Sequence, residues 1–111
     1  MTVDKIKKLV VKYYTRDQYF YDIENAYNRL CELSDQEDIG VYFVISGNAF
    51  ESFSDLDIDI CYYDPDLQVN ITLWWIRNFS VEWIADAIYN AIQKKEKIEN
   101  ILHSNKITEW N

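Results

Sequence analysis

The chain has 111 residues, of which 49% are hydrophobic and 27% are charged, with two glycines and one proline. This composition excludes collagen-like, low-complexity and disordered chains, and the length suits a single domain over residues 1–111. The net charge of −8 argues against direct nucleic-acid binding and against binding to anionic membranes, because both need a basic surface.

The charge is unevenly distributed along the chain. Residues 1–16 have a net charge of +4, residues 17–66 have −12 and residues 67–111 have none. No apolar run approaches the roughly 20 residues of a membrane helix, and the basic first residues lack the apolar core of a signal peptide. We therefore expect a cytoplasmic protein, away from membranes, in which Cys31 and Cys61 are reduced.

Two segments near the start have helical patterns. Residues 3–14 have apolar residues at helical spacing, and the run from Thr15 to Gln18 matches a capping box. That box would begin a second helix at about residue 16, which would end near Ser34. Both apolar stripes have the same phase, so the sequence leaves open whether the two segments form one helix or a pair.

Three segments have strand patterns. Residues 40–46 are apolar on both faces, which predicts a strand that is central or covered on each side. Apolar and polar residues alternate from Asp55 to Tyr63 and again over residues 67–76, and the turn Asp64 to Asp66 separates the two stretches. We therefore predict that residues 56–63 and 67–76 form an antiparallel hairpin that pairs even with odd residue numbers. The side chains expected to face the core are Leu56, Ile58, Ile60 and Tyr62 in the first strand, and Leu67, Val69, Ile71, Leu73 and Trp75 in the second. The alternate residues of the second strand, expected to face away, are Gln68, Asn70, Thr72, Trp74 and Ile76.

A final helix is predicted after Ser80, which is placed to cap it, and apolar spacing continues to Leu102. The last eight residues are expected to form a loose tail. The predicted fold is therefore α+β, with an N-terminal helix or helix pair, a three-stranded antiparallel sheet and a C-terminal helix. The helices would pack on one sheet face and leave the other to solvent or to a partner.

This uncovered sheet face holds the candidate partner-binding site. Three aspartates would stand about 6–7 Å apart along one strand, and such crowding of like charge is unfavourable unless a cationic group meets it. An exposed tryptophan beside carboxylates is typical of a protein-binding hot spot, and a solvated acidic strand is the alternative interpretation. The residues predicted to form the site are Asp55, Asp57, Asp59, Tyr63, Asn70 and Trp74.

One short stretch resembles an enzyme fingerprint. Ile45-Ser46-Gly47, nine further residues and then Asp57-Ile58-Asp59-Ile60 resemble the nucleotidyltransferase superfamily, in which a Gly-Ser or Gly-Gly turn precedes an Asp-hydrophobic-Asp pair. The resemblance implies that Ser46 and Gly47 lie beside substrate phosphates and that Asp57 and Asp59 bind magnesium. It covers about sixteen residues. The turn reads Ser-Gly instead of Gly-Ser, and the family's third carboxylate has no counterpart on the later strand.

No nucleophile or phosphate-loop motif stands out, so we predict no catalytic residue, no metal site and no cofactor. The acidic surface favours a non-enzymatic inhibitor or immunity-type protein that binds and blocks a basic partner, either a toxin or a nuclease inhibited by mimicry of nucleic acid. In general character the chain is similar to antitoxins, small immunity proteins and phage-borne inhibitors such as anti-CRISPR proteins. A magnesium-dependent nucleotidyltransferase is the alternative function, and a homodimer is a further alternative.

Overall fold

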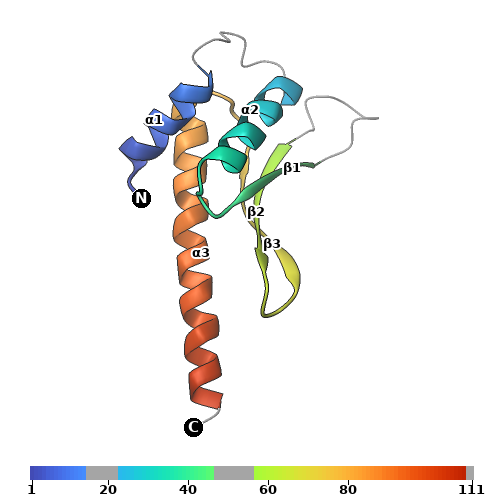
Figure 1. Ribbon diagram of the computed structural model, residues 1–111, viewed down its shortest axis with the longest axis vertical. Coiled ribbons are helices and arrows are strands. Elements are labelled where there is room, and N and C mark those ends of the chain that lie inside the picture. Colours follow the sequence, from blue (N-terminus) through green and yellow to red (C-terminus); the bar gives the residue numbers. More distant parts are fainter. Residues whose placement is uncertain (15–22, 47–56, 110–111) are drawn as a thin grey trace.

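The computed structural model describes residues 1–14, 23–46 and 57–109. Within these ranges the elements in chain order are α1 (Val3–Tyr14), α2 (Ile23–Gln36), β1 (Tyr42–Ser46), β2 (Asp57–Asp64), β3 (Val69–Ile76) and α3 (Val81–Glu109). They form the predicted α+β fold, with an antiparallel sheet in the order β1-β2-β3 (Figure 1).

The N-terminal region contains two separate helices. The described part of α2 begins at Ile23, so the capping box predicted at residues 15–18 lies outside the described residues. After α2 the chain turns at Gly40, whose φ of 77° lies in the left-handed region that favours glycine. A Cβ atom at Gly40 would lie 2.6 Å from the Lys95 Nζ, but this flexible chain end can move aside, so it is the backbone conformation that selects glycine before β1.

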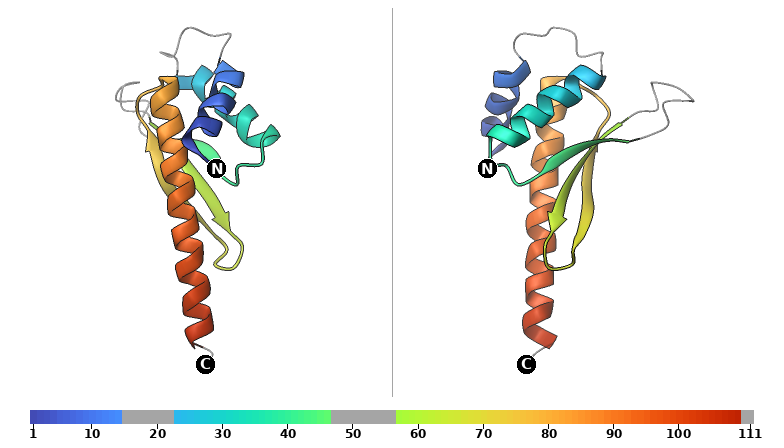
Figure 2. Two further views of the ribbon diagram at one scale, coloured as in Figure 1. Left: turned by 90° about the vertical axis from the view of Figure 1, so that its left-hand side faces the viewer. Right: turned by 45° about the vertical axis from the view of Figure 1, so that its right-hand side comes forward.

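The helices form two layers on one side of the sheet (Figure 2). α2 packs mainly on β1 and α3 mainly on β3, and both also reach the central strand β2. α1 packs on α3 and α2 and, in the described part of the chain, contacts no strand. The helices therefore cover one face of the sheet, as predicted, but α1 forms an outer layer instead of touching the sheet.

The core lies between the sheet and the helices. In β2 the inward side chains of Ile58, Ile60 and Tyr62 are buried, as the alternation of the sequence predicts. Full burial of one such aliphatic side chain stabilises the fold by about 1.5–3 kcal/mol. Other buried members of the core cluster are Ile6, Val10, Ala26, Leu30, Leu33, Ile39, Val41, Phe43, Leu73, Ile76, Ile84, Ala85, Ala87, Ile88, Ala91 and Ile92.

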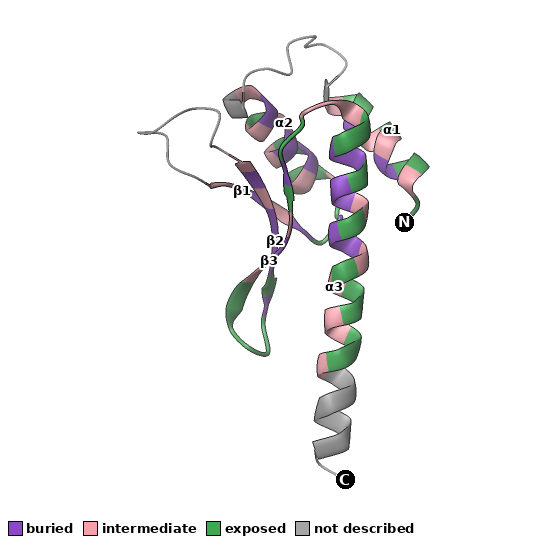
Figure 3. Ribbon diagram, turned by 180° about the vertical axis from the view of Figure 1, so that it is seen from behind, coloured by how far each residue is buried: buried purple, intermediate pink, exposed green. Residues whose placement is uncertain are grey.

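α3 is longer than the sequence predicts. Ser80 caps it by accepting a hydrogen bond at Oγ from the Trp83 backbone N–H, at 3.4 Å. The expected loose tail is wrong for residues 104–109, because the helix continues to Glu109. No glycine or proline interrupts residues 81–109, and the Lys95 and Glu99 side chains, four residues apart, form an ion pair. Between residues 93 and 102 the helix residues are exposed or half-buried and none is fully buried (Figure 3). The helix extends past the tip of the β2–β3 hairpin (Figure 1).

The position of β1 corrects one prediction. The apolar run was expected to be central or covered on both sides, but β1 is an edge strand and Val44 is 41% exposed. The run is apolar on both faces because Tyr42 and Val44 lie on the uncovered face, while Phe43 is buried on the other. A strand that is apolar on both faces can therefore lie at the edge of a sheet with one face uncovered.

The β2–β3 hairpin is confirmed, although its tip and its far end differ from the prediction. Ile71 is half-buried and Leu73 is buried, whereas Leu56 lies outside the described residues. Leu67 and Val69, both predicted to face the core, are exposed, because Leu67 lies in the turn and Val69 is the first residue of β3.

A β-bulge changes the register within the hairpin. Cys61 pairs with Thr72, but the preceding residue of β2, Ile60, pairs with Trp74, so Leu73 is an extra residue of β3. Leu73 is buried and Trp74 is half-buried against the core, so both lie on the covered side. Beyond the bulge Trp75 is exposed and Ile76 is buried, which is the reverse of the predicted alternation.

Candidate partner-binding site

The outer face of the sheet is the face opposite α2 and α3. No helix of the described residues packs on it, and its side chains alternate along β2 with the buried Ile58, Ile60 and Tyr62. Strand pairing assigns its members from all three strands. They are Tyr42, Val44 and Ser46 of β1, Asp57, Asp59, Cys61 and Tyr63 of β2, Asn70, Thr72 and Trp75 of β3, and Arg77 directly after β3.

Carboxylates and an indole ring lie together at one end of the outer face. Asp59 pairs directly with Trp75, whose side chain is 46% exposed. Asp57 forms an ion pair with Arg77, in which Oδ2 and Nε are 3.4 Å apart. The Arg77 guanidinium carbon also lies 5.6 Å from the centre of the Trp75 ring, a cation–π contact. Arg77 is therefore the cation that meets one of the crowded aspartates.

The other end of the outer face is polar and aromatic. Tyr63 is 52% exposed and pairs with Asn70. From β1, the Tyr42 hydroxyl reaches across β2 and donates a hydrogen bond to Asn70 Oδ1. Cys61 is buried on this face with Sγ 3.7 Å from Thr72 Oγ1, and burial raises the pKa of its thiol. Cys31 and Cys61 are both free thiols, as predicted.

The structure brings four of the six predicted site residues onto this face and corrects one. Asp57, Asp59, Tyr63 and Asn70 lie on the outer face, and Asp55 lies outside the described residues. The prediction that Trp74 faces outward is wrong, because the bulge turns it to the covered side. Trp75 takes the place beside Asp59.

A groove that the sequence analysis missed adjoins the outer face. It has a volume of about 400 Å³ and opens between the end of β3 and the first turns of α3. The rings of Trp74 and Trp75 stack with their centres 5.3 Å apart, and Trp83 is 63% exposed. In the sequence, Trp83 does not belong to the apolar positions of α3 that face inward. This was the signal that could have identified it as a large exposed aromatic residue. We call this site the tryptophan groove, and its lining is Trp74, Trp75, Ile76, Arg77, Asn78, Trp83, Asp86, Ala87 and Asn90.

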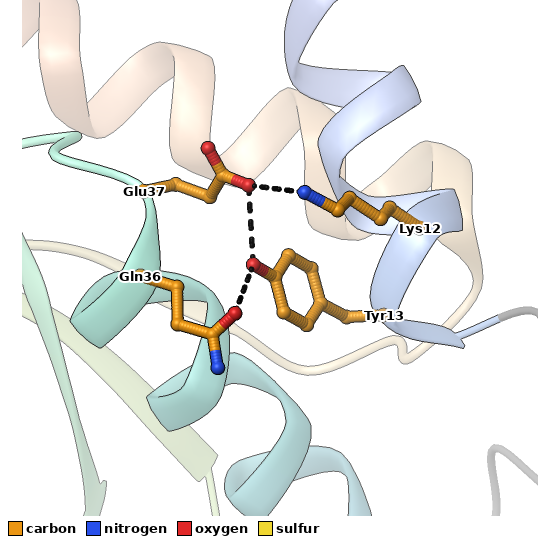
Figure 4. A network of polar contacts seen from close by, with 4 residues as sticks. All are labelled: Lys12, Tyr13, Gln36 and Glu37. Carbon is orange, nitrogen blue, oxygen red and sulfur yellow. Dashed lines mark hydrogen bonds and ion pairs between the residues drawn. The ribbon is translucent and has the colours of Figure 1, made fainter.

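A polar cluster between α1 and the end of α2 has a structural role (Figure 4). Glu37 Oε1 accepts hydrogen bonds from Lys12 Nζ at 2.9 Å and from the Tyr13 hydroxyl at 3.1 Å. The Tyr13 hydroxyl is also 3.2 Å from Gln36 Oε1. The hydrogen bond from Lys12 lowers the pKa of Glu37, and the same contact raises the pKa of Lys12. Burial is the main cause that raises the pKa of Tyr13.

The residues implied as magnesium ligands are only partly available for that role. Asp57 and Asp59 share one face of β2, and Ser46 pairs with Asp57, but the Asp57 carboxylate already binds Arg77. Gly47 lies outside the described residues. Among the side chains that the structure describes, no three of His, Cys, Asp or Glu group closely enough to hold a metal ion.

Comparisons of this chain with models of known protein families, with curated proteins and with solved structures find no match. No helix in the described part of the chain combines the length and the apolar character needed to cross a membrane. The geometry of the outer face and of the tryptophan groove is therefore the basis on which function can be argued.

Proposed function

We propose that this protein is a non-enzymatic inhibitor of the immunity type, which binds a basic surface of another protein through the outer face of its sheet. One observation carries the proposal. The half-exposed Trp75 stands beside the carboxylates of Asp57 and Asp59 on a sheet face against which no described helix packs. A toxin or a nuclease, which binds its own anionic substrate through a basic surface, has the complementary charge.

The two kinds of side chain would contribute differently to binding. The Trp75 ring offers a large apolar area whose burial by a partner is favourable, and tryptophan is enriched among residues that dominate binding energy. The aspartates, in a chain of net charge −8, would attract a basic partner and raise the rate of association. Tyr63, which is exposed, and Val44 extend the contact area along the strands.

The experiment measures binding rates of outer-face variants against the partner captured from the native host. We expect Trp75→Ala to weaken binding by about 2 kcal/mol or more. The double variant Asp57→Asn/Asp59→Asn should mainly slow association and flatten its dependence on salt, because exposed charges act through long-range attraction that salt screens over about 10 Å.

A control with the same change of charge separates position from net charge. Asp38 lies in the loop between α2 and β1 and Glu96 lies in α3; both are exposed and neither belongs to the outer face, so Asp38→Asn/Glu96→Gln should leave binding close to that of the parent. The proposal is wrong if both outer-face variants keep the parent's melting temperature and also bind like the parent.

A further inference from the structure

Arg77 shows which group the end of the outer face is suited to hold. Its guanidinium carbon lies 5.6 Å from the centre of the Trp75 ring, and its Nε lies 3.4 Å from Asp57 Oδ2. An indole face and a carboxylate together are the two surfaces that a guanidinium group prefers, because it is planar, cationic and rich in N–H donors.

The same combination recurs nearby without a cation. Asp59 lies directly opposite Trp75 in the strand register, and Asp86 lines the tryptophan groove together with Trp83. Within the described ranges neither carboxylate forms an ion pair. The two rings are 46% and 63% exposed, so apolar area and negative charge are both available at this end of the molecule.

We infer that the tryptophan groove, together with Asp59 and Asp86, receives an arginine side chain of the partner protein, and that Arg77 is its internal competitor. As far as it concerns the partner, the inference rests on the proposed function. Arginine fits better than lysine because its flat guanidinium stacks on an indole ring and donates two parallel hydrogen bonds to a carboxylate. The surrounding acidic charge favours any cation, but the stacked rings select a planar one.

The contacts that hold the Arg77 side chain are weak enough for another cation to displace it. Its side chain is 71% exposed, and an ion pair in such an exposed position contributes little to stability. Replacing it with glutamine would free the Trp75 face and the Asp57 carboxylate and would remove one positive charge. We therefore expect Arg77→Gln to bind an arginine probe about three-fold more tightly than the parent, given the usual strength of exposed cation–π and ionic contacts.

The experiment needs no natural partner. The indole N–H resonances of the protein are assigned with single Trp→Phe variants and then followed during titration with the peptide Gly-Arg-Gly-Arg-Gly. Matched peptides carry lysine, of equal charge, or citrulline, which has the shape of arginine without its charge. The resonances of Trp75 and Trp83 should shift with the arginine peptide, less with lysine and not with citrulline. Trp83→Ala and Asp59→Asn/Asp86→Asn should weaken binding, whereas Asp38→Asn/Glu96→Gln should not.

Several results would overturn the inference. Equal responses to lysine and arginine would mean that the groove recognises charge alone, and an absent response would mean that it binds no arginine. Resonances of Trp75 and Trp83 that change with protein concentration alone would assign the groove to a second copy of the chain. If the arginine peptide does not bind but Trp75→Ala still abolishes binding of the natural partner, this inference alone is refuted. If the peptide binds but the outer-face variants bind the partner like the parent, the proposed function alone is refuted.

Discussion

Tyr62 combines a ring that belongs to the core with a polar hydroxyl group that is buried beside it. Its hydroxyl is buried and has no hydrogen-bond partner among the described residues, while the Lys95 ammonium lies 5.6 Å from the centre of its ring. Burial raises the pKa of this hydroxyl, and the nearby carboxylates of Asp64 and Glu99 raise it further. The ring belongs to the core, so the hydroxyl oxygen is the unfavourable part of the side chain.

We therefore expect Tyr62→Phe to raise the free energy of unfolding by about 1 kcal/mol, because the change removes a buried polar group that lacks a partner. Urea denaturation of parent and variant measures the difference. Tyr13→Phe is the control, since that hydroxyl does bond to Glu37 and its loss should not stabilise the protein. A less stable Tyr62→Phe would mean that the hydroxyl is satisfied in solution.

Glu37 gives the fold a dependence on acidity. Hydrogen bonds from Lys12 and Tyr13 lower the pKa of Glu37 in the folded protein, so folding favours its ionised form. That contribution to stability is present above the pKa of the unfolded chain and is lost as the pH falls through the lower pKa of the folded state. We expect the stability difference between the parent and Glu37→Gln to be largest near neutral pH and to shrink below about pH 4, near the ordinary glutamate pKa. Thermal unfolding across pH 2–7 tests this, and a pH-independent difference would contradict it.

At the scale of elements, the turn of the hairpin depends on one buried carboxylate. Asp64 Oδ1 accepts hydrogen bonds from the backbone N–H groups of Asp66 and Leu67, at 2.9 and 3.1 Å, and Asp64 is only 5% exposed. The side chain thereby closes the loop and fixes where β3 begins.

Replacing Asp64 with alanine should lower the free energy of unfolding by about 1–3 kcal/mol, because two backbone donors lose a charged acceptor. Asp64→Asn keeps an acceptor oxygen at the same place and should cost less. Denaturant titration of both variants gives the comparison. Equal losses would show that the charge, and not the position of the oxygen, holds the turn.

The elements themselves could be predicted from the sequence, but the register of β3 could not. A helix or strand that is buried on one side has apolar residues at a regular spacing, and this spacing is visible in the sequence of the helices and of β2. From Leu73 to Ile76, however, four consecutive residues are apolar, so this stretch has no alternation that could reveal the bulge. Two neighbouring tryptophans were equally suitable for either face, and only the pairing with β2 decides between them.

The candidate site was predictable to the extent that it depends on β2. Asp57, Asp59 and Tyr63 follow from the period of two, whereas the contact between Arg77 and Trp75 depends on where β3 ends. The tryptophan groove forms where α3 packs beside β3. Local sequence patterns do not show how these two elements are placed relative to each other.

At the scale of the whole molecule, the proposed inhibitor and the alternative nucleotidyltransferase differ in what they bind. If Asp57 and Asp59 bound magnesium for nucleotidyl transfer, millimolar magnesium with ATP would raise the melting temperature, because a ligand selective for the folded state stabilises it. We expect no such increase. A clear increase that disappears in Asp57→Asn, but not in the charge-matched control Asp38→Asn, would favour the enzyme.

The bulge in β3 also determines which changes of chain length the molecule can tolerate. Deleting one residue from a strand normally turns every later side chain over, and one sheet face is exchanged for the other. Here Leu73 is the unpaired extra residue, so a chain without it could form a regular ladder with Trp74 still opposite Ile60 and Trp75 still opposite Asp59. A deletion at this position would keep Trp75 opposite Asp59 and so preserve the acidic and aromatic surface, although it would remove from the core a leucine that is only 1% exposed.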